Sequence, residues 1–288
     1  MIFMLKLLDR EVRAIVQIDP AEETISNGLL YAVAHAADAV TIYGLKNVTS
    51  EKLERLTKRM RYIANQVKET DNHDVIVIVE PTNYLHLPVR TFKTISKLAD
   101  VIGIPYVVNT RNRRNLISGG REKGAYRFYD GQQRRLFKRM SRKGIPISRE
   151  QFKKHAVFVH NITSDIARYT NATPYQGLES LLSDVEFEIT WGGADILHHD
   201  WSGIYGDPIK IKEVRTVRDK IGSTVPIVVS GNISTSERGI EMLNSGADAI
   251  ILGNELKDIA SSLSVINGIK PKKNSHNPED EIGKSVVA

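Results

Sequence analysis

The sequence predicts a single closed (β/α)8 TIM barrel, and two observations lead to this prediction. Short runs rich in Val and Ile recur along the chain, and near-continuous apolar runs are typical of parallel strands covered on both faces. Helical patterns separate these runs without a break, which suits one closed barrel of 288 residues better than two doubly wound domains. The runs span residues 12–18, 38–43, 74–80, 105–110, 156–161, 194–199, 226–231 and 247–253.

The segments between the runs have the spacing of amphipathic helices. Residues 50–69 carry apolar side chains three or four positions apart, with Ser50 as the expected N-cap. Residues 235–246 begin with Thr and Ser and end at a glycine, the usual residue after a helix. Each of these helices would pack one apolar face on the barrel.

The composition excludes several classes of chemistry. The chain has no cysteine, which excludes disulfides, thiolate zinc ligands, Fe–S clusters and a cysteine nucleophile. An apolar content of 41% is enough to bury a core. The opening residues 1–10 are interrupted by charges and lack a cleavage site, so we expect a cytoplasmic protein without a signal peptide or a membrane partner.

The net charge of +6 is unevenly distributed. Residues 111–155 contain fifteen Lys and Arg against three Asp and Glu, and they form a connection after the fourth strand that is longer than barrel loops usually are. Residues 269–288 are polar and lack periodicity. We therefore expect a barrel over residues 1–268 with a basic insertion at 111–155, followed by a flexible tail at 269–288.

The basic insertion allows several interpretations. Arg111, Arg113, Arg114 and Arg121 lie among glycines, so this segment could close as a loop over a phosphorylated substrate or a nucleotide. Residues 111–144 could instead bind nucleic acid such as RNA. They could also be a solvated helix face or a subunit contact in a homo-oligomer.

Barrel active sites lie at the carboxyl ends of the strands, and this position selects the candidates for proton transfer and orientation. Neighbouring residues on a strand point to opposite sides, so only one of His198 and His199 can face the barrel mouth. Asp200 has the same orientation as His198 and could orient it or bind a substrate hydroxyl. The candidate catalytic residues are Glu80, Asn109, His160, His198 and Asp200.

Glu80 ends an apolar strand directly before Pro81. A carboxylate among Val and Ile should have a raised pKa and could serve as a general acid or base. It could instead pair structurally with Arg13 or Arg111.

Two glycine turns predict a phosphate site. Ser230, Gly231 and Asn232 follow the seventh strand, and Gly253 and Asn254 follow the eighth. Glycine allows close approach of the backbone, and helix N-termini offer free N–H groups to an anion. We expect these two turns to hold a phosphate.

The last strands resemble known phosphate-binding barrels. PIVVSGN and GADAIILGN resemble the corresponding segments of the ribulose-phosphate-binding and flavin-linked barrels, and residues 194–266 are most similar to BtpA-like proteins through IYGDPIKIKEVR. The amino-terminal half departs from that family, with VQIDPAEET where BtpA proteins have an HLPPLPG-like run. The resemblance implies the barrel type, and through the flavin-linked barrels it implies FMN as one cofactor.

Three functions remain open from the sequence. The preferred one is an enzyme acting on a phosphorylated small molecule by isomerase, lyase or transferase chemistry. The alternatives are an FMN-linked oxidoreductase and a BtpA-like or RNA-binding assembly protein. No metal site formed by protein residues alone is expected; Mg²⁺ bridging a substrate phosphate and a carboxylate suits the oxygen-rich strand ends better than zinc.

Overall fold

The computed structural model describes residues 5–7, 10–21, 25–44, 48–81, 87–109, 138–145, 149–175, 177–202, 211–253 and 256–269. Eight parallel strands close into a barrel in the order β10-β3-β4-β5-β6-β7-β8-β9, which confirms the predicted fold class. The barrel strands are β3 (Ala14–Ile18), β4 (Ala39–Tyr43), β5 (Ile76–Glu80), β6 (Val101–Val107), β7 (Phe152–Val159), β8 (Ile196–Asp200), β9 (Ile227–Ser230) and β10 (Ala249–Leu252).

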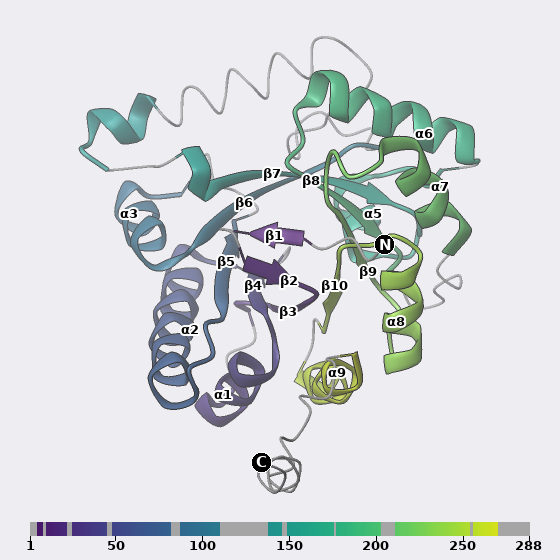
Figure 1. Cartoon of the computed structure of the whole chain (residues 1–288). Helices are drawn as coiled ribbons and strands as arrows, with labels where there is room; N and C mark the ends of the chain where they lie inside the picture. Colours follow the sequence, from purple (N-terminus) through teal and green to yellow (C-terminus); the bar gives the residue numbers. More distant parts are fainter. Residues whose placement is uncertain are drawn as a thin grey trace, which may run out of the picture.

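Helices surround the barrel on its outside (Figure 1). The helix α5 is short and covers part of the mouth, where Ile166 and Ala167 pack on interior residues of β6 and β7. The helices are α1 (Asn27–Ala36), α2 (Ser50–Asp71), α3 (Val89–Leu98), α5 (Asp165–Thr170), α6 (Leu178–Phe187), α7 (Ile211–Ile221), α8 (Ser236–Asn244) and α9 (Leu256–Ile269).

Strands β6 and β7 begin several residues earlier than predicted. Gly103 and Pro105 break the apolar pattern at the start of β6, and Lys153 and Lys154 made the start of β7 look like the basic insertion. The predicted insertion boundary at residue 155 was therefore wrong, because β7 begins at Phe152. Close packing explains the glycine at position 103, because an added Cβ would lie 2.6 Å from Cγ of Glu80 on the neighbouring strand.

The helix caps follow the side-chain chemistry of the sequence. The Thr49 hydroxyl, not the predicted Ser50, accepts from the Lys52 backbone N–H at 3.2 Å and caps α2. Thr235 caps α8 in the same way through Arg238 N. A threonine hydroxyl one residue earlier satisfies the same unpaired backbone donors of the first turn.

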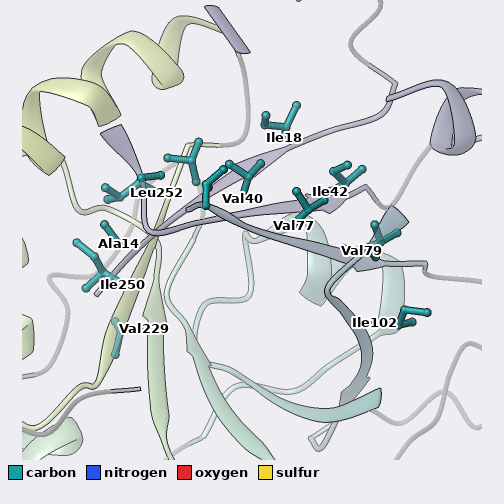
Figure 2. Packing of buried hydrophobic residues seen from close by; sticks show 14 of the residues in the cluster. Ala14, Ile18, Val40, Ile42, Val77, Val79, Ile102, Val229, Ile250 and Leu252 are labelled. Atoms are coloured by element: carbon teal, nitrogen blue, oxygen red, sulfur yellow. The ribbon is translucent and has the colours of Figure 1, made fainter. Parts of the chain in front are cut away.

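The core has two layers separated by the strands. Outward-facing strand residues such as Val40, Val77 and Ile250 pack against the helices, as Figure 2 shows. Inward-facing residues such as Ile76, Ile78 and Ile196 fill the barrel interior. Val12 belongs to this inner cluster and lies in β2 (Arg10–Val12), which pairs with β1 (Leu5–Leu7). This unpredicted hairpin lies across the amino-terminal end of the barrel, in the centre of Figure 1, so the site must open at the other end.

Several predictions fall on residues outside the described ranges. These are the loop arginines Arg111, Arg113, Arg114 and Arg121, the turn residue Asn254, most of the basic segment 111–144, and the tail beyond Ile269. None of the described helices is long and apolar enough to cross a membrane.

Candidate functional site

A pocket of about 420 Å³ opens at the carboxyl ends of the strands. Residues that end β3, β4, β8, β9 and β10 line it, together with residues of α5 and α9. The polar lining residues are Gln17, Asp19, Tyr43, Asp165, His198, Asp200, Ser202, Ser230, Asn232, Ser234, Ser261 and Ser262. The pocket thus brings most of the predicted strand-end residues together.

The two glycine turns lie side by side on one wall of this pocket. Gly231 and Gly253 have φ of 89° and 72°, a backbone conformation that L side chains rarely adopt. An added Cβ on Gly231 would lie 2.6 Å from Cα of Ser202, so the loop after β9 touches the loop after β8. Asn232 fixes this contact by donating its Nδ2–H to the Trp201 carbonyl at 2.9 Å. The turns therefore present backbone to the pocket where a phosphate was predicted.

Asp200 is the buried acceptor at the floor of the pocket. Its side chain is almost fully buried, and its Oδ1 accepts from the Ser230 hydroxyl at 2.9 Å and the Ser202 backbone N–H at 3.1 Å. Oδ2 has no hydrogen-bond partner among the described residues. Burial raises the pKa of Asp200, and hydrogen bonding with Ser202, Ser230 and Ser164 partly offsets this. An acceptor of this kind suits a hydroxyl donor from a ligand.

His198 faces the pocket and His199 faces the helices. His198 is therefore the one of the two histidines that faces the barrel mouth. Nε2 of His198 lies 2.7 Å from the Ser230 hydroxyl. Burial, followed by the neighbouring His155 and His199 rings, holds the pKa of His198 well below its usual range. His198 is therefore a neutral ring joined to Asp200 through Ser230.

Glu80 does not line the pocket and instead lies deeper in the barrel. Its Oε1 is 2.7 Å from Nδ1 of His155, and both side chains are buried. The sequence interpretation did not consider this histidine as a partner, and the expected Arg111 lies outside the described residues. The signal was available, because His155 shares its orientation with the inward-facing Val157 and Val159.

The structure does not bring Asn109 or His160 into the pocket. The Asn109 side-chain amide donates to the carbonyls of Val159 and Thr173 at 2.7 and 2.8 Å, and its Oδ1 accepts from Val159 N. Asn109 thus ties the ends of β6 and β7 to the segment after α5.

His160 lies on the outer face of the barrel. Its ring stacks on Trp201 with centroids 4.0 Å apart, and its Nε2 lies 3.0 Å from Nδ1 of His199. Nδ1 of His160 is 3.6 Å from the Glu213 carboxylate of α7. Burial lowers the pKa of His199 to about 3, so this ring is neutral. The stack joins β8 to α7 and contributes packing rather than a pocket wall.

The predictions missed Asp165, which lies at the first position of α5 and lines the pocket. Ser164 caps this helix through Ala167 N at 2.9 Å, a Ser-Asp pattern that marks a helix start. Asp19, directly after β3, also lines the pocket, and Gly44 makes room for it: an added Cβ there would lie 2.8 Å from Asp19 Cγ. Asp19 and Asp165 therefore add two carboxylates to the pocket lining.

No group of three or more His, Asp or Glu in the described part of the chain could hold a metal ion. The carboxylates of Asp19 and Asp165 lie in a pocket that also contains the proposed phosphate turns. An Mg²⁺ ion shared between a carboxylate and a bound phosphate remains a prediction for this pocket.

Comparison with known proteins identifies the family. A model of the PcrB family matches residues 8–269. The chain belongs to the PcrB family. This family consists of phosphate-binding barrels, which confirms the kind of barrel expected from the glycine turns. The family is not the BtpA family that the last third of the sequence resembles, and the flavin-linked type is not supported either.

Two relatives align with this chain over almost its whole length. Geranylgeranylglyceryl phosphate synthase of Saccharolobus solfataricus is 21% identical over 272 residues, covering 93% of this chain and 92% of the relative. Heptaprenylglyceryl phosphate synthase of Oceanobacillus iheyensis is 24% identical over 259 residues, covering 89% and 95%. These relatives are transferases that act on a phosphorylated small molecule, so the comparisons do not favour isomerase or lyase chemistry.

Solved structures show the same fold. The GGGPS of Thermoplasma volcanium has a TM-score of 0.64 at 19% identity, and the alignment covers 90% of each chain. The geranylgeranylglyceryl phosphate synthase of Thermoplasma acidophilum, in complex with its substrate sn-glycerol-1-phosphate, also has a TM-score of 0.64, at 17% identity with 90% and 93% covered. At this identity the likeness shows the shared barrel.

Proposed function

We propose that this chain is a prenyltransferase that joins a prenyl group to a hydroxyl of a glycerol phosphate. Membership of the PcrB family and the names of its two synthase relatives support this class of reaction. The pocket supplies the two things that glycerol phosphate needs: glycine turns for the phosphate and a buried acceptor for a hydroxyl. The observation that carries the proposal is Oδ2 of Asp200, buried without a partner among the described residues in the same pocket as those turns.

The phosphate of the substrate would lie against the turns at Gly231 and Gly253. Backbone N–H groups and the start of α8 can bind it without a charged side chain. This assigns the predicted phosphate-binding residues Ser230, Gly231, Asn232, Gly253 and Asn254 to one end of the substrate. The glycerol hydroxyls would then extend toward Asp200.

Asp200 would accept the proton of the attacking hydroxyl at Oδ2. The hydroxyl oxygen forms a bond to the first carbon of an allylic prenyl diphosphate, the bond from that carbon to the diphosphate oxygen breaks, and diphosphate leaves with the electron pair. A raised pKa makes Asp200 a stronger proton acceptor than an exposed aspartate. Asp19 and Asp165, which also line the pocket, are candidates to hold an Mg²⁺ ion together with the diphosphate, and Mg²⁺ is the cation predicted from the sequence.

The test is incubation of the purified protein with sn-glycerol-1-phosphate and prenyl diphosphates of increasing chain length, with the product measured by mass spectrometry. Asp200→Asn should lower kcat by about 100-fold or more, because general-base groups contribute rate factors of about 10² to 10⁴. The matched control is Asp195→Asn just before β8, whose carboxylate accepts from Lys154 N at the opposite end of the barrel and should leave kcat unchanged. Absence of product with every chain length, together with no binding of glycerol phosphate, would refute the proposal.

A further inference from the structure

A second group of polar side chains lies inside the barrel beneath the pocket. Glu80 of β5 and His155 of β7 form a buried pair, and the ring of His155 stacks on His198 with centroids 4.8 Å apart and an interplanar angle of 21°. Residues of this group line an internal cavity of about 20 Å³ that is separate from the pocket. The proposed transfer reaction does not use Glu80 or His155, although buried polar groups of this kind are costly to keep.

The hydrogen bonds above this pair determine where protons reside. The Ser230 hydroxyl has one proton, and it points to Oδ1 of Asp200 at 2.9 Å. The 2.7 Å contact between Ser230 Oγ and His198 Nε2 must then be donated by the histidine. When Asp200 is ionised, His198 is therefore the tautomer with its proton on Nε2.

The charge of His198 determines how strong a base Asp200 is. A protonated His198 would put a cation two hydrogen bonds from the carboxylate, which would stabilise the ionised form of Asp200 and weaken it as a proton acceptor. Burial is the main factor that opposes that protonation, followed by the neighbouring His155 and His199 rings, and the flat stack on His155 limits how the His198 ring can turn. Glu80 in turn fixes His155 through Nδ1, and the close packing of Gly103 fixes Glu80.

The charged groups around these rings come from several strands. Glu80 and Lys153 line the internal cavity with His155, and Asp200 lies above His198. Asp19 and Asp165 lie on the pocket side, while His199 faces the other side of β8. Of these groups, His155 is the one stacked directly on the His198 ring inside the barrel.

We propose that His155, held by Glu80, is a positioning residue whose ring keeps Nε2 of His198 turned toward the Ser230 hydroxyl. His198 then directs the Ser230 hydroxyl to Oδ1 of Asp200 and leaves Oδ2 for the substrate hydroxyl. This inference rests on the proposed function for the role of Asp200, but the protonation of His198 can be measured without turnover.

The experiment compares wild type with His155→Leu, which removes the flat ring and its hydrogen bond to Glu80. Long-range ¹H–¹⁵N NMR of histidine-labelled protein at neutral pH should show His198 of the wild type as the Nε2–H tautomer. In His155→Leu the same signals should report a mixture of tautomers. We expect kcat of this variant to fall about ten-fold or more, while the Kd for inorganic phosphate changes less than about two-fold because the glycine turns are intact.

Two further variants separate positioning from folding. Glu80→Gln keeps an oxygen that accepts from His155 Nδ1 and should retain more activity than Glu80→Leu, which should resemble His155→Leu. The control is Tyr106→Phe, which removes a buried hydrogen bond to Glu188 on the outer face and should change neither kcat nor the His198 signals. If His155→Leu does not fold, the two Glu80 variants decide by the same measurements.

Wild-type His198 signals and wild-type kcat in a folded His155→Leu or Glu80→Leu would overturn the inference. Absence of prenyl transfer by the wild type would instead remove the proposed function, while the NMR measurement would still test how His155 positions His198. The two failures are therefore distinguishable.

Discussion

Glu188 is a buried carboxyl group far from the pocket, and its ionisation should reduce the stability of the folded protein near neutral pH. It begins the π-helical turn η2 (Glu188–Gly192), is 1% exposed, and accepts one hydrogen bond from the Tyr106 hydroxyl at 2.5 Å. Its Oε1 has no partner among the described residues. Burial raises the pKa of Glu188 to about 7 from 4.5, and the hydrogen bond from Tyr106 only partly offsets this.

The sign of the effect follows from which state binds the proton. Between pH 4.5 and about 7 the folded protein keeps the proton on Glu188 while the unfolded chain has released it. The free energy of unfolding must therefore fall as the pH rises through this window, and it levels off above about pH 7. The difference between the pKa of Glu188 in the folded protein and in the unfolded chain corresponds to roughly 3 kcal/mol of unfolding free energy, at about 1.4 kcal/mol per pKa unit. Glu188→Gln removes the titration while keeping an oxygen for Tyr106.

The assay is urea denaturation of wild type and Glu188→Gln at about pH 5 and about pH 8. Between these pH values the free energy of unfolding of the wild type should fall by about 3 kcal/mol more than that of the variant. Asp200 and Asp248 also have pKa values raised by burial, but they titrate in both proteins and cancel in the comparison. Glu186→Gln, in the exposed ion pair with Lys220, should shift both curves by less than about 0.5 kcal/mol. An equal difference between wild type and Glu188→Gln at both pH values would refute the reasoning.

Two further predictions concern packing and charge burial. Gly231→Ala should cost more than about 2 kcal/mol of stability and weaken phosphate binding in a titration, whereas Gly222→Ala, also at positive φ but in open space, should cost about 1 kcal/mol and leave binding unchanged. Arg218→Met should cost about 3–5 kcal/mol in denaturation experiments, because it leaves the buried Asp248 carboxylate without its cation. Lys220→Met, in the exposed pair with Glu186, should cost less than about 1 kcal/mol, and equal losses for the two would contradict the role of burial.

The fold could be predicted because its signal is local. Eight apolar runs and the helices between them are properties of short segments, and the rules of strand direction and crossover then leave few arrangements. The errors lie where a local signal conflicts with a tertiary contact. Gly103 reads as a break in a strand, yet it lies inside β6 because the Glu80 side chain from β5 occupies the space a Cβ would need.

The residues of the candidate site could be predicted only from the alternation of side chains along a strand and from the positions of the strand ends. Alternation gave His198 and Asp200 a shared orientation opposite to that of His199 but did not tell which side faces the barrel mouth. The structure places His198, Asp200 and both glycine turns along the pocket. The sequence pattern could not tell that His160, at the end of β7, stacks outward on Trp201, because that orientation depends on α7 and on Glu213. His155 was overlooked for a related reason: its partner Glu80 is 75 residues away in the chain.

The sequence by itself determined the barrel, the two glycine turns and the list of polar strand ends, since each follows from residue types a few positions apart. Only the tertiary structure decided which of those side chains meet. Closing the barrel brings β5, β7, β8 and β9 around one interior, so Glu80, His155, His198, Ser230 and Asp200 come within contact of one another. The buried, half-satisfied state of Asp200 is a property of that enclosure, because in the unfolded chain water would satisfy the same carboxylate.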